Sequence, residues 1–187
     1  MITAINNTQQ PSFQAKLELK GIKLRDQQKI CERFEAITQH YKSDVLEVAP
    51  QVIEKADGST FKNTNFACNG RNVGFMIYLK EFKDFCKQHT TEEIAKSLSK
   101  IFKAAKQNEV HRAKMTELQK GKERALTNLN RAEYMPNSKI SESLTARSLA
   151  RLENIEQQTA SEQTKHNTIT EKILKDDPIN ENFYLED

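Results

Sequence analysis

The fold of this chain is decided by one stretch, Leu46–Leu79, which reads LEVAPQVIEKADGSTFKNTNFACNGRNVGFMIYL. Strand-forming residues there are separated by Asp57-Gly58 and by Asn69-Gly70, which are strong signals for hairpin loops. A two-residue loop of this kind needs positive φ at both central positions, and Asn, Asp and Gly tolerate that conformation. The stretch therefore predicts a three-stranded antiparallel meander.

The register of the meander follows from its second loop. With Asn69-Gly70 at the turn, three pairs face one another: Cys68 with Arg71, Phe66 with Val73, and Thr64 with Phe75. The last strand alternates cleanly, but the first two mix apolar residues on both faces, so either both faces are partly covered or a bulge shifts the register. Pro50 cannot donate a ladder hydrogen bond, which predicts an edge or a bulge at that point.

The segments around the meander predict an α+β domain over residues 13–106, after a disordered N-terminus at residues 1–12. Residues 13–20 alternate as a strand does and should pair with an edge of the meander, giving a small antiparallel sheet of four strands. A helix is expected at about residues 24–42 and a short one near residues 82–89. Thr90 and Glu93 then form a capping box that starts a longer helix.

Beyond this domain, residues 107–175 are expected to form a long helical extension, followed by a flexible acidic tail at residues 176–187. The apolar stripe of Met115, Leu118, Leu126 and Leu129 is rotated by about 100° from the stripe that precedes it, more than helical drift explains. The helix therefore either breaks near residues 107–112 or continues and buries a different face. An αα-hairpin of residues 113–134 against 141–160 is predicted.

Composition limits the class of protein. Of 187 residues, 36% are hydrophobic and 29% are charged, which is too polar for one tightly packed globule. No apolar run is long enough for a membrane-spanning helix, and the first ten residues lack the features of a secretory signal. Three scattered cysteines, Cys31, Cys68 and Cys86, indicate a reducing compartment, so a cytoplasmic location is expected.

Charge is distributed unevenly along the chain. Residues 80–135 carry 13 basic and 8 acidic residues, whereas residues 136–187 carry 6 basic and 10 acidic residues. Solvated helix surfaces explain this division simply. The alternatives are an anionic partner for the basic part, or an acidic tail that folds back on it.

Motifs that carry catalytic chemistry are missing from the sequence. It contains no glycine-rich phosphate loop, no G-x-S-x-G, no H-E-x-x-H and no C-x-x-C. Cys86 and His89 form half of a metal site at most, and zinc would need two further ligands. We therefore predict no catalytic residue, no metal site and no cofactor. An enzyme would need a pocket in which a cysteine and a histidine meet.

Two kinds of binding remain. The first is a non-catalytic cytoplasmic protein-interaction module, whose partner protein, or second copy, contacts the amphipathic C-terminal helices at Met115, Leu118, Leu126 and Leu129. The same residues could instead pack on residues 144–155. The second is an RNA- or DNA-binding module that uses the lysine stripe Lys96, Lys100, Lys103 and Lys106. The run Phe183-Tyr184-Leu185 is either a short docking segment or a strap over the core.

Overall fold

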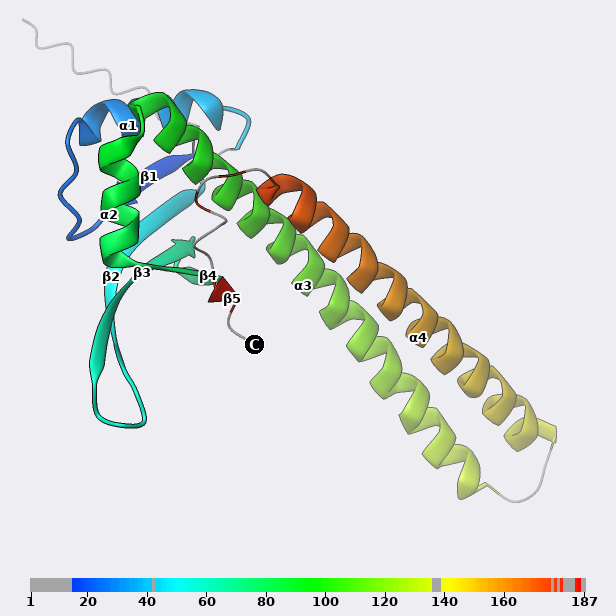
Figure 1. The fold of residues 1–187 in the computed structure, drawn as a ribbon. Coiled ribbons are helices and arrows are strands. Elements are labelled where there is room, and N and C mark those ends of the chain that lie inside the picture. Colours follow the sequence, from blue (N-terminus) through cyan, green and yellow to red (C-terminus); the bar gives the residue numbers. More distant parts are fainter. Residues whose placement is uncertain are drawn as a thin grey trace, which may run out of the picture. The chain divides into compact units, whose positions relative to one another are not determined.

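The computed structural model describes residues 15–41, 43–135, 139–175, 177, 179 and 184–185, and it has an α+β fold (Figure 1). The chain divides into two compact units. One contains residues 1–103 together with 174–187, and the other contains residues 104–173. The expected disorder of residues 1–12 concerns residues outside the described part of the chain.

The first unit is built on a mixed sheet with the strand order β1-β2-β3-β4-β5. Its strands are β1 (Lys16–Leu19), β2 (Val45–Glu54), β3 (Thr60–Cys68), β4 (Arg71–Tyr78) and β5 (Tyr184–Leu185). The predicted meander and its N-terminal fourth strand are confirmed. However, β1 pairs with β2 in parallel, so the sheet is not purely antiparallel as predicted. A helical crossover separates the two strands, and such a connection permits parallel pairing.

The two predicted turns differ in detail. Asn69 and Gly70 have φ of 51° and 76°, as the two-residue loop requires. At the other turn only Gly58 has positive φ, and the loop between β2 and β3 has five residues, 55–59. The prediction of a two-residue loop there was wrong. Asp57 shapes this turn through its carboxylate, which accepts hydrogen bonds from the backbone N–H of Ser59 at 2.9 Å and its hydroxyl at 2.6 Å.

A bulge changes the pairing of β3 with β4. Cys68 lies opposite Arg71 as predicted, but Thr64 lies opposite Ile77 and not Phe75, because the register shifts between Asn65 and Ala67. The bulge was one of the two explanations that the sequence left open. On the other side of the meander, β1 stops opposite Val48, so Pro50 lies on an exposed strand edge.

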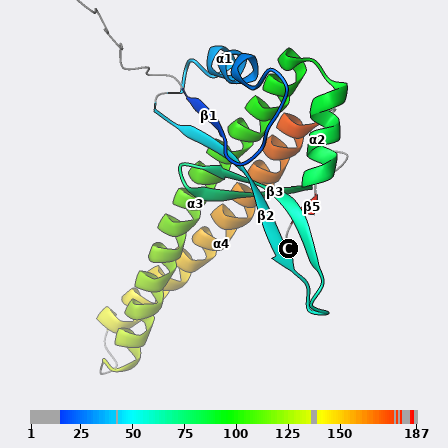
Figure 2. The same ribbon diagram turned by 90° about the vertical axis from the view of Figure 1, so that its left-hand side faces the viewer.

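Helices and sheet share an aromatic core. It is formed with α1 (Gln27–Ile37), α2 (Leu79–Gln88) and the start of α3 (Thr91–Glu133), which are grouped beside the sheet in Figure 2. The ring of Phe34 meets that of Phe102 edge-on at 5.7 Å between centroids, and Phe66 meets Phe82 at 5.9 Å. The predicted capping box is present, since the Thr90 N–H donates to the Glu93 carboxylate at 2.9 Å.

The segment after the last helix returns to this core. Leu174 and Ile179 are buried, and the Asp177 carboxylate is only 5% exposed. It accepts a hydrogen bond from the Ser97 hydroxyl at 2.9 Å and forms an ion pair with the Lys100 ammonium group at 3.0 Å. Acidic and basic parts of the chain therefore do meet, as one reading of the charge pattern proposed. Farther on, β5 pairs with β4 at Phe75 and Met76, whereas Phe183 lies outside the described residues.

The second unit is the predicted αα-hairpin. Helix α3 is continuous through residues 107–112, so of the two alternatives that the sequence left open, the helix continues and buries a different face farther along. Helix α4 (Lys139–Leu174) also runs through the polar residues 157–167. Neither helix, nor any other in the described part of the chain, has an apolar stretch long enough to cross a membrane.

Candidate functional site

The helical hairpin of the second unit is held by a heptad seam. Shielded residues recur at alternating intervals of three and four along both helices, as in a coiled coil. In α3 they are Ala104, Asn108, His111, Met115, Leu118, Lys122, Ala125, Leu129 and Ala132. In α4 they are Ser141, Thr145, Ser148, Leu152, Ile155, Thr159, Glu162, His166 and, one heptad later, Ile173.

Contacts across the seam fix an antiparallel register. The imidazole rings of His111 and His166 stack with their centroids 4.2 Å apart. Nearer the connection, the Ser141 hydroxyl donates a hydrogen bond to the Ala132 carbonyl at 2.9 Å. Between them, a Cβ at Gly121 would lie 3.2 Å from the end of Ile155, so the backbone there approaches its partner closely.

The apolar content of this seam is small. Among the described residues in the middle and distal parts of the hairpin, only Leu118, Ala125, Ala132 and Ile155 are buried hydrophobic residues. Serine, threonine and histidine side chains occupy many of the other seam positions. Because the seam is polar, some of the apolar side chains of the two helices lie beside it and stay uncovered. A further helix could cover them.

The residues predicted to bind a partner fall on and beside this seam. Leu118 is buried at 8% exposure and Met115 and Leu129 are half-buried, so part of the predicted stripe packs within the hairpin. Leu126 stays 43% exposed. Met115 and Leu118 also line a groove of about 410 Å³. The rest of its lining consists of Gln119, Lys122, Ile155, Glu156, Thr159, Ala160 and Gln163.

Two exposed leucines lie beyond the groove on the same side of the hairpin. Gln119, Glu156 and Gln163 all occupy the heptad position that flanks one side of the seam, and we call this side of the hairpin the groove side. Leu126 is one heptad after Gln119, and Leu149 is one heptad before Glu156, so both belong to the same side. The register places these two leucines at the same level. Leu149 is 54% exposed and was not singled out from the sequence.

The two sides of the hairpin carry opposite charge. The heptad positions on the groove side hold Glu109, Glu123, Glu133, Glu142, Glu153 and Glu156, with Arg112 and Lys139 as the basic residues. The positions on the other side hold Lys114, Arg124, Arg131, Arg147, Arg151, Lys165 and Lys172, with Glu117 as the one acidic residue. We call this second side the arginine side. A partner of either side is therefore selected by charge as well as by shape.

The lysine stripe predicted for nucleic acid is largely neutralised. Lys96 lies 3.5 Å from the Glu92 carboxylate and Lys100 lies 3.0 Å from that of Asp177. Lys106 is paired with Glu109. Among the described residues, only Lys103 of the four has no ion pair. Less free positive charge is left for a phosphate backbone than the sequence suggested.

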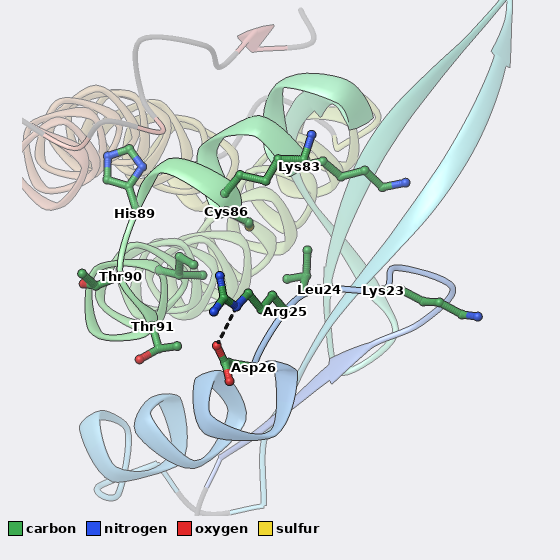
Figure 3. A pocket seen from close by; sticks show the side chains of 11 residues that line it. Lys23, Leu24, Arg25, Asp26, Lys83, Cys86, His89, Thr90 and Thr91 are labelled. Carbon is green, nitrogen blue, oxygen red and sulfur yellow. Dashed lines mark ion pairs between the residues drawn. The ribbon is translucent and has the colours of Figure 1, made fainter.

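A further cavity, of about 550 Å³, lies in the first unit between the segment before α1 and the junction of α2 with α3 (Figure 3). Both Cys86 and His89 line it. The His89 ring packs on Phe85 with centroids 4.2 Å apart, and its Nδ1 lies 2.9 Å from the Phe85 carbonyl oxygen. No hydrogen bond between Cys86 and His89 is described, and Figure 3 shows the His89 ring turned away from the thiol.

The chemistry of this cavity does not suit a thiol nucleophile. Burial raises the pKa of Cys86 to about 12, so the thiol stays protonated at neutral pH. In the part of the chain that the structure describes, no three His, Cys, Asp or Glu side chains are gathered to hold a metal ion. The lining is basic, but its positive charges do not converge on the cavity. Arg25 forms an ion pair with Asp26 at 3.6 Å, and Figure 3 shows Lys23 pointing outward.

Comparison of the chain with protein-family models, with curated proteins and with solved structures gave no match.

Proposed function

We propose that this protein is a non-catalytic interaction module whose helical hairpin receives an amphipathic helix of a partner protein on its groove side. The observations that support it are the groove lined by Met115 and Leu118 and the exposed pair Leu126 and Leu149 farther along the same side of the hairpin. Helices that dock in such grooves present apolar side chains at intervals of three and four residues. The seam buries too few apolar residues to stabilise the hairpin by itself.

The size of the surface fits one short helix. From the level of Leu126 to the level of Gln163 the groove side extends over about 14 residues, or about 21 Å of helix. A partner helix of about four turns would cover it. An interface of this size is at the small end of specific protein contacts, which favours a reversible complex.

Charge favours a basic partner helix over a second copy of the chain. Glu123, Glu153 and Glu156 lie along the rim, and no ion pair is described for any of them. In a symmetric dimer the same side of both copies would meet, and these carboxylates would face one another at a cost. A helix with lysine or arginine beside its apolar stripe would instead complement the rim.

A synthetic peptide tests this proposal. The probe is a labelled 16-residue helix with a leucine stripe flanked by lysines, and its binding to the full chain is followed by fluorescence anisotropy. Leu126→Asp with Leu149→Asp should reduce its affinity at least tenfold, because two carboxylates would then enter an apolar strip. Val110→Asp is the matched control, since Val110 is 63% exposed but lies off the groove side.

Two outcomes would contradict the proposal. One is equal binding of a peptide with the same leucines flanked by glutamates. The other is an affinity that the Leu126 and Leu149 substitutions leave unchanged. Light scattering of the purified chain adds a third check, because a dimer that Leu126→Asp converts to a monomer would identify a second copy as the occupant. Point variants are preferred to truncation, since Leu174 and Ile179 are buried residues of the first unit.

A further inference from the structure

The arginine side of the hairpin gathers half of the chain's arginines near its connection. The sequence has eight arginines, of which Arg124, Arg131, Arg147 and Arg151 occupy this side, and all four are exposed. The seam register places Arg124 of α3 at the level of Arg151 of α4. Arg131 is one heptad farther along α3, about 10 Å away along the helix axis. The four guanidinium groups therefore come from both helices and share one short stretch of the hairpin.

These arginines are free of salt bridges in the part of the chain that the structure describes. By contrast, the one acidic residue on the same side, Glu117, lies 3.3 Å from the ammonium group of Lys120. A shallow hollow of about 420 Å³ lies along α3, lined by Arg124 and Arg131 together with Lys120, Thr127, Asn128 and the acidic Glu123 of the groove side. Its hydroxyl and amide groups add neutral hydrogen-bond donors to the cationic ones.

We propose that the arginine side binds the phosphate backbone of a nucleic acid. The planar guanidinium group presents paired N–H donors that match phosphate oxygens, which is why arginine is preferred for that ligand. Phosphate contacts of this kind hold a duplex without reading its sequence. The site is separate from the lysine stripe of Lys96 to Lys106 and does not depend on the partner helix proposed for the groove side.

An acidic protein fits this surface less well. Protein interfaces have an apolar core, and aromatic or aliphatic anchors supply most of their binding energy. The large apolar residues near the four arginines on this side are the half-buried Leu144 and the exposed Ile140, which are too few to form such a core. A surface of unpaired cations without an apolar core is instead typical of contacts with nucleic acids, whose interfaces are polar and strongly positive on the protein side.

The experiment measures binding of the full chain to labelled 20-base-pair DNA and RNA duplexes by fluorescence anisotropy between 50 and 200 mM salt. Replacing all four arginines with glutamine should lower the affinity at least tenfold at the lower salt concentration. The slope of log affinity against log salt should become shallower by up to about 3.6, since each lost phosphate contact contributes about 0.9. Circular dichroism checks that both helices remain folded.

The matched control removes the same charge elsewhere. Lys16, Lys23, Lys62 and Lys80 are exposed residues of the first unit, and their replacement with glutamine gives the same net charge as the arginine variant. This control should keep its affinity within about twofold. An equal loss in both variants, or no loss in the arginine variant, would overturn the proposal. So would competition by polyglutamate as strong as that by unlabelled duplex of equal charge.

A second variant separates this inference from the proposed function. The variant with Leu126→Asp and Leu149→Asp changes only the groove side. It should reduce peptide binding, while its duplex binding should fall by no more than about twofold. The arginine variant should have the opposite pattern. If one variant abolished both activities, the two surfaces would not be independent, and the assignment of the duplex to the arginine side would fail.

Discussion

The imidazole rings of His111 and His166 lie stacked across the hairpin, with centroids 4.2 Å apart and planes 11° from parallel. Burial lowers the pKa of His166, the nearby His111 lowers it further, and Glu162 on the same helix opposes both effects. The folded hairpin therefore takes up a proton at His166 less readily than the unfolded chain does. Stacking of two neutral rings is compatible with this position, but stacking of two cations is not.

The first prediction is that acid destabilises the hairpin through this pair. Above the unfolded pKa of histidine, near 6.5, the His166 ring is neutral in both states and has no linkage effect. As the pH falls below that value, the unfolded state binds the proton first and the free energy of unfolding decreases. Thermal melts followed by circular dichroism should give a lower Tm at pH 5 than at pH 7.5. His166→Gln should flatten this dependence, and an unchanged pH profile in that variant would contradict the prediction.

The second prediction concerns Gly121, the point of close approach between the helices. Gly121→Ala should raise the stability of the hairpin by about 0.5 kcal/mol, because alanine favours the helix by up to about 1 kcal/mol and the end of the Ile155 side chain can move by a few tenths of an ångström. Gly121→Val should lower it by about 1–2 kcal/mol, since a branched side chain crowds the seam. Urea denaturation measures both.

A matched control for Gly121 is Ala113→Gly, at an exposed position on the same helix. It should cost about 1 kcal/mol from helix propensity alone. If Gly121→Ala destabilised the chain instead, this prediction would be wrong. The end of the Ile155 side chain would then be unable to move away from the added methyl group.

The third prediction concerns the charge pair that fastens the segment after α4. Lys100→Met leaves the Asp177 carboxylate, which is 5% exposed, without its cation and should cost about 2 kcal/mol in the free energy of unfolding. Adding Asp177→Asn should recover part of that loss, because no buried charge is then left unpaired. Lys96→Met, which breaks only the exposed pair with Glu92, should cost less than about 0.5 kcal/mol. Additive effects of the Lys100 and Asp177 substitutions would refute this account.

The fourth prediction concerns Cys86. With a pKa raised to about 12 by burial, it should react with a disulfide reagent at pH 8 at least a hundredfold more slowly than in the chain unfolded in guanidinium chloride. A variant with Cys31→Ser and Cys68→Ser isolates the reaction of this one thiol. Equal rates in the folded and unfolded chain would show that the thiol is not shielded.

Local signals in the sequence predicted most of the first unit. The Asn69-Gly70 loop and the Thr90 capping box depend only on neighbouring residues, and both are confirmed. The pairing of Thr64 with Phe75 was wrong for a physical reason. A register shift of two residues keeps every side chain on its own face of the sheet, and Phe75 and Ile77 are both still buried. The hydrophobic pattern is therefore the same for either register.

The hairpin was harder to predict because its seam is polar. Thr159, Glu162 and His166 have no hydrophobic signal of their own, yet they take seam positions opposite α3. Met115, Leu118 and Leu126 were found from their helical spacing. Leu149 was missed because it lies beside the stripe of its own helix, and only the register between the helices brings it level with Leu126. The division of charge between the two sides depends on the same register.

Pro50 has a consequence for how the protein behaves at high concentration. Because β1 ends opposite Val48, the outer side of β2 from Pro50 to Glu54 has no neighbouring strand among the described residues. Such a bare strand is a template on which chains can stack into aggregates. Proline has no N–H to offer an incoming strand, so the intermolecular ladder would lose a bond at its first step. Pro50 therefore disfavours the stacking of further chains on this edge of the meander.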